Sequence, residues 1–144
     1  MNDKKRILIL CTGNSARSQM AEGLLREMGE GNLDVMSAGV APSFVRPEAV
    51  EAMSEVGIDI SAHRSKSVDE FVGQNFDFII TVCDNANESC PVFPGEAIRI
   101  HQSFEDPPSE SVGNYQSRLK IFRRVRDQIR EWLEVFVGET NLLL

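Results

Sequence analysis

The sequence predicts an α/β fold, in which a four-stranded parallel sheet is flanked by helices on both faces. Two observations indicate this class: short, almost wholly apolar runs such as residues 6–10 recur along the chain, and they alternate with longer segments of helical spacing. A nearly continuous apolar run is typical of a strand buried on both faces, as in a parallel sheet between helical layers. The chain has 144 residues, about the length of one domain, so we expect a single domain over residues 1–144.

The elements follow in order along the chain. The four predicted strands are residues 6–10, 33–37, 76–82 and 97–100. Apolar residues three and four apart predict three helices, which cover residues 20–28 up to Gly29, residues 47–56 between Pro47 and Gly57, and residues 119–136. The remaining polar segments, residues 83–95 and 105–113, are predicted loops because they are rich in turn-forming and acidic residues.

Composition excludes several classes of partner. The 22 acidic and 15 basic side chains leave a net charge of −7, which disfavours nucleic acid and anionic membranes. No apolar run approaches the ~20 residues that span a bilayer. The apolar residues 7–10 are too few for the core of a signal peptide. We therefore expect a cytoplasmic protein without a nucleic-acid or membrane partner, although a local site can still bind a small anion.

The three cysteines, Cys11, Cys83 and Cys90, do not read as a disulfide framework, because their number is small and odd. Buried thiols, metal ligands, redox chemistry and nucleophilic chemistry all remain open at this point. A zinc site is disfavoured because no Cys-x2-Cys pair occurs and neither His63 nor His101 lies in a ligand cluster. We expect no metal, and both histidines to be ordinary surface or strand-end residues.

Residues 11–18 join the first predicted strand to the first helix. In a parallel sheet, ligands bind beyond the carboxyl ends of the strands, where Cys11, Cys83 and the loop at 105–113 are all expected. A strand-to-helix turn directs backbone N–H groups and the helix dipole at one point, which suits a tetrahedral oxyanion. The predicted oxyanion-binding residues are Thr12, Gly13, Asn14, Ser15, Ala16 and Arg17.

Cys11 and Arg17 carry the predicted chemistry of this turn. The Arg17 guanidinium is suited to grip two oxygens of an oxyanion at once. The positive surroundings favour the thiolate of Cys11, and Ser18 is placed to donate a hydrogen bond to its sulfur. Gly13 lets the backbone close tightly around the anion. The alternative is a core cysteine with an unrelated arginine nearby.

The segment Cys11-Thr12-Gly13-Asn14-Ser15-Ala16-Arg17-Ser18 resembles the phosphate-binding loop of low-molecular-weight protein tyrosine phosphatases and of the arsenate reductases that share their fold. Residues 37–39, 57–61 and 106–108 also match, so the resemblance covers nearly the whole chain. It implies that Cys11 is a nucleophile and that Asp106 protonates the leaving oxygen. An Asp before two prolines is otherwise a common way to hold a turn.

Residues 81–91 are similar to the redox segment of thioredoxin-coupled arsenate reductases. That resemblance implies a relay without a cofactor: Cys11 attacks arsenate, Cys83 attacks Cys11 and releases arsenite, and Cys90 then forms the Cys83–Cys90 disulfide that thioredoxin reduces. The phosphatases typically lack this cysteine pair and carry an aromatic residue where this chain has Pro108. A tyrosine phosphatase, a non-enzymatic oxyanion-binding or redox-sensing module, and glutaredoxin with glutathione as donor remain the alternatives.

Some members of the family bind potassium beside the anion loop. Asn14, Glu22 and Ser37 match three of its ligands, but Lys66 stands where an aspartate would complete the set. A lysine ammonium repels a cation and can occupy its place. The sequence therefore predicts an enzyme that does not depend on potassium.

Overall fold

The computed structural model describes residues 4–84, 86, 93 and 95–142. Within these residues four parallel strands pair in the order β2-β1-β3-β4. The strands are β1 (Lys5–Cys11), β2 (Leu33–Gly39), β3 (Phe78–Thr81) and β4 (Ile98–His101). The predicted four-stranded parallel sheet is confirmed, and its order places β1 and β3 in the centre.

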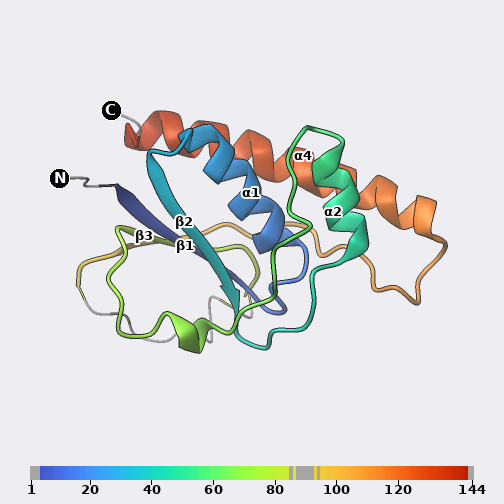
Figure 1. Cartoon of the computed structure of the whole chain (residues 1–144), viewed down its shortest axis with the longest axis horizontal. Helices are drawn as coiled ribbons and strands as arrows, with labels where there is room; N and C mark the ends of the chain where they lie inside the picture. The colour runs from blue at the N-terminus through green and yellow to red at the C-terminus, as the bar shows by residue number, and fades with distance from the viewer. Residues whose placement is uncertain (1–3, 85, 87–92, 94, 143–144) are drawn as a thin grey trace.

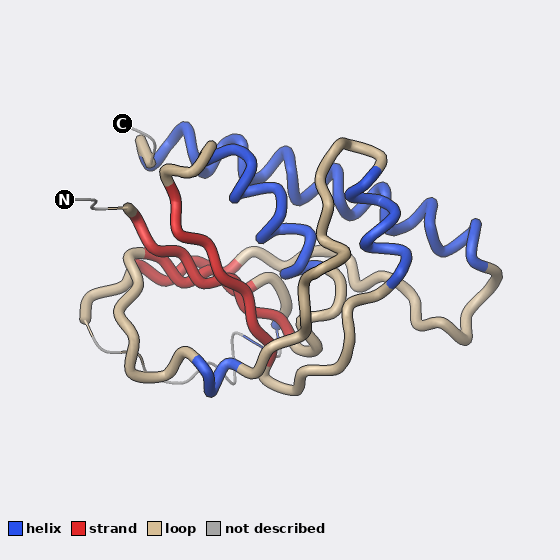
Figure 2. The backbone as a smooth tube through the Cα atoms, in the orientation of Figure 1, coloured by secondary structure: helices blue, strands red, loops and turns tan. Residues whose placement is uncertain are grey.

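Helical segments lie on both sides of this sheet. The helices α1 (Arg17–Gly29), α2 (Pro47–Ser54) and α4 (Tyr115–Thr140) lie together on one side (Figure 1). The short 3₁₀ helix η1 (Val68–Glu70) lies on the other side (Figure 2). None of the helices in the described part of the chain is long and apolar enough to cross a bilayer.

The core is centred on β1 and the helices above it. The four residues Ile7, Leu8, Ile9 and Leu10 are fully buried, so both faces of this strand are covered. Each such side chain contributes about 1.5–3 kcal/mol of burial free energy. On β3, the Phe78 ring meets the Phe136 ring of α4 edge to face at 5.3 Å. This contact packs the start of β3 against the end of α4.

Two predicted strands differ from the observed ones. The strand expected at residues 76–82 is β3, and Phe76 precedes it because its ring packs in an aromatic cluster with Phe71 and Phe93. The strand expected at residues 97–100 is β4, a sheet edge on which Ile98 is 56% exposed. The expectation of burial on both faces is wrong for this strand, because its residues lie at the margin of the sheet and are exposed or only partly covered.

Helix boundaries depend on caps more than on the apolar stripe. The last helix begins before the predicted residue 119 because Asn114 and Ser117 form a capping box, and it ends at Asn141 in a left-handed conformation. The second helix ends at Ser54, before the predicted residue 56. The chain turns there at Gly57, whose φ is +82°.

Candidate active site

The loop at residues 11–18 lies at the carboxyl end of β1 and is bordered by residues 40–46. Backbone N–H groups of that segment donate to four carbonyl groups of the loop. The pairs are Val40 to Cys11 (3.2 Å), Ala41 to Thr12 (2.8 Å), Ser43 to Gly13 (3.0 Å) and Arg46 to Ser15 (2.9 Å). Because a trans peptide directs its C=O and N–H to opposite sides, the N–H groups that follow these carbonyls turn to the inside of the loop. Such a concave row of N–H groups is an anion-binding nest.

Asn14 holds the tightest bend of this loop. It is fully buried and has a φ of +49°, a region that Asn tolerates better than most residues. Its backbone N–H donates to the Sγ atom of Cys11 over 3.2 Å, which confirms the inward orientation. The left-handed residue of the loop is Asn14 and not Gly13. At Gly13 an added Cβ would lie 3.2 Å from the Oγ atom of Ser43 and 3.4 Å from that of Ser15, so little room is left there for a side chain.

Gly39, the last residue of β2, lies directly against the loop. A Cβ atom at this position would lie 2.5 Å from the carbonyl oxygen of Thr12 and 2.9 Å from the backbone nitrogen of Asn14. Both neighbours are backbone atoms that cannot move without changing the loop. Residue 39 must therefore lack a side chain, which gives a physical reason for the glycine in the segment at residues 37–39.

The sulfur of Cys11 has a second hydrogen-bond partner in Ser18. The Ser18 Oγ atom lies 2.9 Å from it and accepts a bond from the Nδ2 of Asn14 over 2.7 Å. The bond from Asn14 leaves the Ser18 proton free to be donated to the sulfur, although either atom of the Cys11–Ser18 contact can be the donor. This agrees with the predicted contact. Cys11 is 3% exposed, and donors of this kind stabilise a thiolate.

Arg17 joins the loop to the segment that follows β4. Its guanidinium donates to the carbonyl oxygen of Phe104 over 3.2 Å and lies 3.3 Å from the Oδ1 atom of Asp106. The side chain of Asp106 is 79% exposed, so this carboxyl group lies at the surface beside Arg17. The neighbouring Glu105 is paired with Arg124 at 2.6 Å, and this bond holds the pKa of Glu105 below its usual value. Asp106 is therefore the carboxyl group beside the candidate oxyanion site.

Cys83 follows β3 and reaches the same loop. Its sulfur lies 3.2 Å from the Oγ1 atom of Thr12 and accepts a long hydrogen bond of 3.4 Å from the backbone N–H of Ala86. Cys83 is 5% exposed. The structure thus brings together the predicted residues Cys11, Arg17, Ser18, Cys83 and Asp106. Cys90 lies outside the described residues, and its role stays a prediction.

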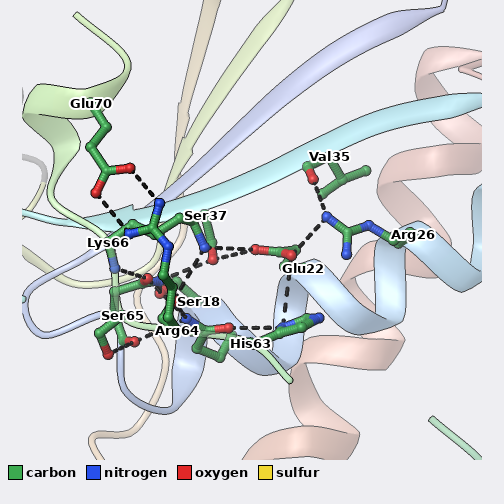
Figure 3. Close-up of polar contacts among 12 residues, drawn as sticks. Ser18, Glu22, Arg26, Val35, Ser37, His63, Arg64, Ser65, Lys66 and Glu70 are labelled. Carbon is green, nitrogen blue, oxygen red and sulfur yellow. Dashed lines mark hydrogen bonds and ion pairs between the residues drawn. The ribbon is translucent and has the colours of Figure 1, made fainter. Parts of the chain in front are cut away.

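A second polar cluster lies behind the loop, around the buried carboxylate of Glu22 (Figure 3). Ser37 donates to it over 2.5 Å, Arg26 lies at 2.7 Å, and the ammonium of Lys66 lies at 3.6 Å. Lys66 thus stands beside Glu22, the position in which its ammonium was expected to replace a cation. No group of three or more His, Cys, Asp or Glu side chains suited to a metal ion occurs among the residues that the structure describes.

Gln19 links this cluster to the anion loop, and the sequence argument missed it. Its Nε2 donates to the backbone carbonyl and to the side-chain oxygen of Asn14, at 3.2 and 2.9 Å. Its Oε1 therefore accepts from the Nδ1 of His63 at 3.0 Å (Figure 3 shows His63 beside Glu22). The expectation of an ordinary surface role for His63 is wrong: its side chain is 16% exposed, and burial lowers its pKa. The available signal was a polar residue next to Met20 on the apolar side of a helix.

Known proteins resemble this chain over nearly its whole length. Residues 6–142 match the low molecular weight phosphotyrosine protein phosphatase family. The chain belongs to this family. An arsenate reductase of Halalkalibacterium halodurans is 42% identical over 134 residues, which are 93% of this chain and 96% of the relative.

Solved structures of an arsenate reductase and of a phosphatase are similar to this chain in fold. An arsenate reductase in the oxidized state superposes with a TM-score of 0.77 at 34% identity, covering 94% of this chain and 98% of the other. A low molecular weight protein tyrosine phosphatase from T. tengcongensis superposes with a TM-score of 0.74 at 25% identity, covering 94% and 99%. The resemblance that the loop motif indicated is thereby confirmed.

Proposed function

We propose that this chain reduces arsenate to arsenite through a thiol relay that begins at Cys11. The observation that carries the proposal is the 3.2 Å contact between Thr12 and Cys83, because it brings a second thiol to the anion loop. Hydrolysis of a phosphate ester needs one thiol only, whereas reduction of arsenate consumes two. The arsenate reductases among the relatives support the same assignment.

The first step is binding of the oxyanion and attack by Cys11. The inward N–H groups of residues 12–17 and the Arg17 guanidinium hold the arsenate oxygens. The Cys11 thiolate attacks arsenic, so that an S–As bond forms and an As–O bond breaks. The leaving oxygen takes a proton from Asp106 and departs as water, which leaves Asp106 ionised beside Arg17.

The second step transfers the electrons. The Cys83 thiolate attacks the sulfur of Cys11, an S–S bond forms, and the S–As bond breaks. The electron pair of the broken bond stays on arsenic, which goes from the +5 to the +3 state and leaves as arsenite. The two thiols have then supplied two electrons and are joined as the Cys11–Cys83 disulfide.

The last step restores Cys11. The Cys90 thiolate attacks the sulfur of Cys83, releases the Cys11 thiolate and leaves a Cys83–Cys90 disulfide. A cytoplasmic dithiol protein, thioredoxin, then reduces that disulfide, and glutaredoxin with glutathione is the less favoured donor. The similarity of residues 81–91 to a redox segment supports this step. No bound cofactor is required.

A phosphatase is the second candidate, because one observation favours it independently. The nest, Cys11, Arg17 and Asp106 suffice to cleave a phosphate monoester, and they lie together in this structure. Phosphate and arsenate are both tetrahedral oxyanions, so the same loop would accept either. Weak phosphatase activity is therefore expected beside arsenate reduction.

A Cys83→Ser variant tests the proposal. Arsenite formation with thioredoxin, thioredoxin reductase and NADPH should fall to background. Hydrolysis of p-nitrophenyl phosphate should persist, because Cys83 does not take part in it. A Cys11→Ser variant serves as the control that loses both activities. Arsenate turnover that survives in Cys83→Ser would show that the relay is wrong, and a wild-type chain that hydrolyses the ester without forming arsenite would favour the phosphatase.

A further inference from the structure

A chain of hydrogen bonds joins Asp84, the residue after Cys83, to β4. The ring of His101, the last residue of β4, makes two bonds of 2.8 Å: its Nδ1 meets the Oγ1 of Thr81, and its Nε2 meets the Oδ1 of Asp84. The hydroxyl of Ser103 donates to the same Asp84 oxygen over 3.0 Å. These side chains play no part in the relay described above.

From this geometry we propose that His101 and Asp84 are positioning residues, which hold Cys83 beside the anion loop for its attack on Cys11. The inference deepens the proposed function and rests on it. It assigns the pair to the formation of the Cys11–Cys83 disulfide, and not to the earlier attack of Cys11 on the oxyanion.

The backbone on either side of Cys83 explains why such a support is needed. The last residue of β3 is Thr81, and beyond it the N–H of Phe104 donates to the carbonyl of Val82 over 3.2 Å. Cys83 directly follows Val82, whose carbonyl accepts this bond. The bond from Asp84 to His101 attaches the next residue to β4 as well, so Cys83 is held on both sides.

The lowered pKa of Asp84 agrees with its hydrogen bond to His101. The hydrogen bonds from His101 and Ser103 lower the pKa of Asp84, and the charge of Arg17 acts in the same direction. An ionised Asp84 only accepts hydrogen bonds, so the Nε2 of His101 carries the proton that it donates. The opposite nitrogen, Nδ1, bonds the hydroxyl of Thr81, so the ring is fixed at both ends.

Loss of the contact between His101 and Asp84 is expected to change the orientation of the Cys83 sulfur. Cys83 must bring its sulfur in line with the bond that breaks at Cys11, and a displacement of about 1 Å costs on the order of 100-fold in rate. Removal of the His101 ring or of the Asp84 carboxylate breaks the bond that attaches the residue after Cys83 to β4, while the contacts of the Cys83 sulfur with Thr12 and Ala86 remain. Attack of Cys11 on an oxyanion does not use this contact.

The test measures the disulfide directly. In a Cys90→Ser background, the relay stops at the Cys11–Cys83 disulfide, and its rate of formation after mixing with arsenate is followed by the loss of 2 Da in the intact mass. His101→Ala and Asp84→Ala should each slow this step by about tenfold or more. Asp84→Asn should recover most of the rate, since its amide oxygen still accepts from His101. Asp69→Ala, an exposed aspartate of η1, is the matched control and should have no effect.

Phosphatase activity, the rate of disulfide formation and the recovery by Asp84→Asn together decide whether the inference holds. Hydrolysis of p-nitrophenyl phosphate should stay within about twofold in each variant, as is usual for substitutions away from the reacting groups. An unchanged disulfide rate would overturn the inference. So would a parallel loss of phosphatase activity and disulfide formation, or a failure of Asp84→Asn to recover the rate, since either result would indicate a role in folding alone.

A hydrogen peroxide arm separates this inference from the proposed function. The Cys11 thiolate attacks peroxide, whose O–O bond breaks to give a sulfenic acid and hydroxide, and the Cys83 thiol then displaces water from that sulfenic acid to give the same disulfide. If the background chain forms the disulfide with peroxide but not with arsenate, arsenate reduction is wrong for this protein. The positioning inference is then judged on the peroxide rates of the same variants: slower rates support it, and equal rates overturn it.

Discussion

The Oγ1 atom of Thr12 lies 3.2 Å from the Sγ atom of Cys83, although 71 positions separate the two residues along the chain. Thr12 follows β1 and Cys83 follows β3, and these strands are neighbours in the sheet. Their carboxyl ends therefore meet at one edge, where the second thiol reaches the anion loop. The proposed relay rests on this contact.

Asp106 is expected to act as the acid at the entrance. Asp106→Asn should lower both arsenate turnover and p-nitrophenyl phosphate hydrolysis by about 10²–10⁴-fold, the usual contribution of a general acid. Inorganic phosphate should still bind, because the loop is unchanged, and inhibition constants would measure this. Glu105→Gln is the matched control, since Glu105 is paired with Arg124 away from the site. Equal losses in both variants would contradict the assignment.

Gly39 should not tolerate a methyl group. Gly39→Ala would place a Cβ atom 2.5 Å from the carbonyl oxygen of Thr12, so the anion loop must shift. We expect a loss of about 1–3 kcal/mol in the free energy of unfolding, together with weaker phosphate binding. Urea unfolding and phosphate titration measure the two effects.

Gly138 of α4 provides the control for that substitution. A Cβ at Gly138 meets no atom within 4 Å, and alanine favours a helix by about 0.5–1 kcal/mol over glycine. Gly138→Ala should therefore be neutral or stabilising, with unchanged phosphate binding. A Gly39→Ala protein as stable as Gly138→Ala would show that the loop has more room than the structure indicates.

Lys66 should make the protein indifferent to potassium. Its ammonium lies 3.6 Å from Glu22 and donates to the carbonyl of Arg64 at 3.3 Å, so a positive charge already faces this carboxylate. Arsenate turnover should be equal in potassium and sodium salts at the same ionic strength. A rise of several-fold with potassium alone would refute this expectation.

The reverse substitution gives the prediction a second test. Lys66→Asp replaces the ammonium with a second carboxylate near Glu22, so the variant should be less stable and should regain stability when potassium is added. Lys120→Asp, an exposed lysine of α4, changes the net charge equally and should show no response to potassium. Thermal unfolding in potassium and sodium salts measures the difference.

Tyr115 is the one tyrosine of the sequence, so its ionisation can be followed alone. Burial and the hydrogen bond that it donates to Glu51 raise its pKa to about 12. Absorbance at 295 nm should therefore change with a midpoint near 12 while circular dichroism shows the chain still folded. A midpoint near the ordinary value of about 10 would contradict the hydrogen bond to Glu51.

The same shift predicts how stability depends on pH. The folded state holds the Tyr115 proton more tightly than the unfolded chain, so the contribution is complete below pH ~10 and is lost as the pH rises towards about 12. Tyr115→Phe should lower the free energy of unfolding at pH 8 by about 1 kcal/mol, the typical net value of one hydrogen bond. Urea unfolding at several pH values should show that difference shrinking above pH 10.

Much of the fold could be predicted because its signals are local. The run of residues 6–10 is apolar throughout, and β1 is the fully buried strand that this pattern indicates. The boundaries were less accurate where side-chain chemistry outweighs periodicity, as with the cap formed by Asn114 and Ser117. The exposure of Ile98 was not predictable, since an apolar run looks the same in a central strand and in an edge strand.

The candidate site, like the fold, was predictable where its contacts join neighbouring residues and not where they join distant segments. The contact between Cys11 and Ser18 was expected because both belong to one strand-to-helix turn of eight residues. The roles of Gln19 and His63 were missed, because a buried polar side chain is recognised only when its partners are known. These partners come from α1 and from the segment before η1, which no sequence spacing connects.

The sequence by itself determined the strand and helix types and the anion-binding turn with its nucleophile and arginine. Periodicity, turn chemistry and helix dipoles act over neighbouring residues, so they can be read from consecutive positions. Only the tertiary structure decided that Cys83 meets Thr12, that Lys66 faces Glu22, and that Asp84 bonds His101 of β4. Those contacts follow from the strand order β2-β1-β3-β4, and the same apolar runs would suit other orders equally well.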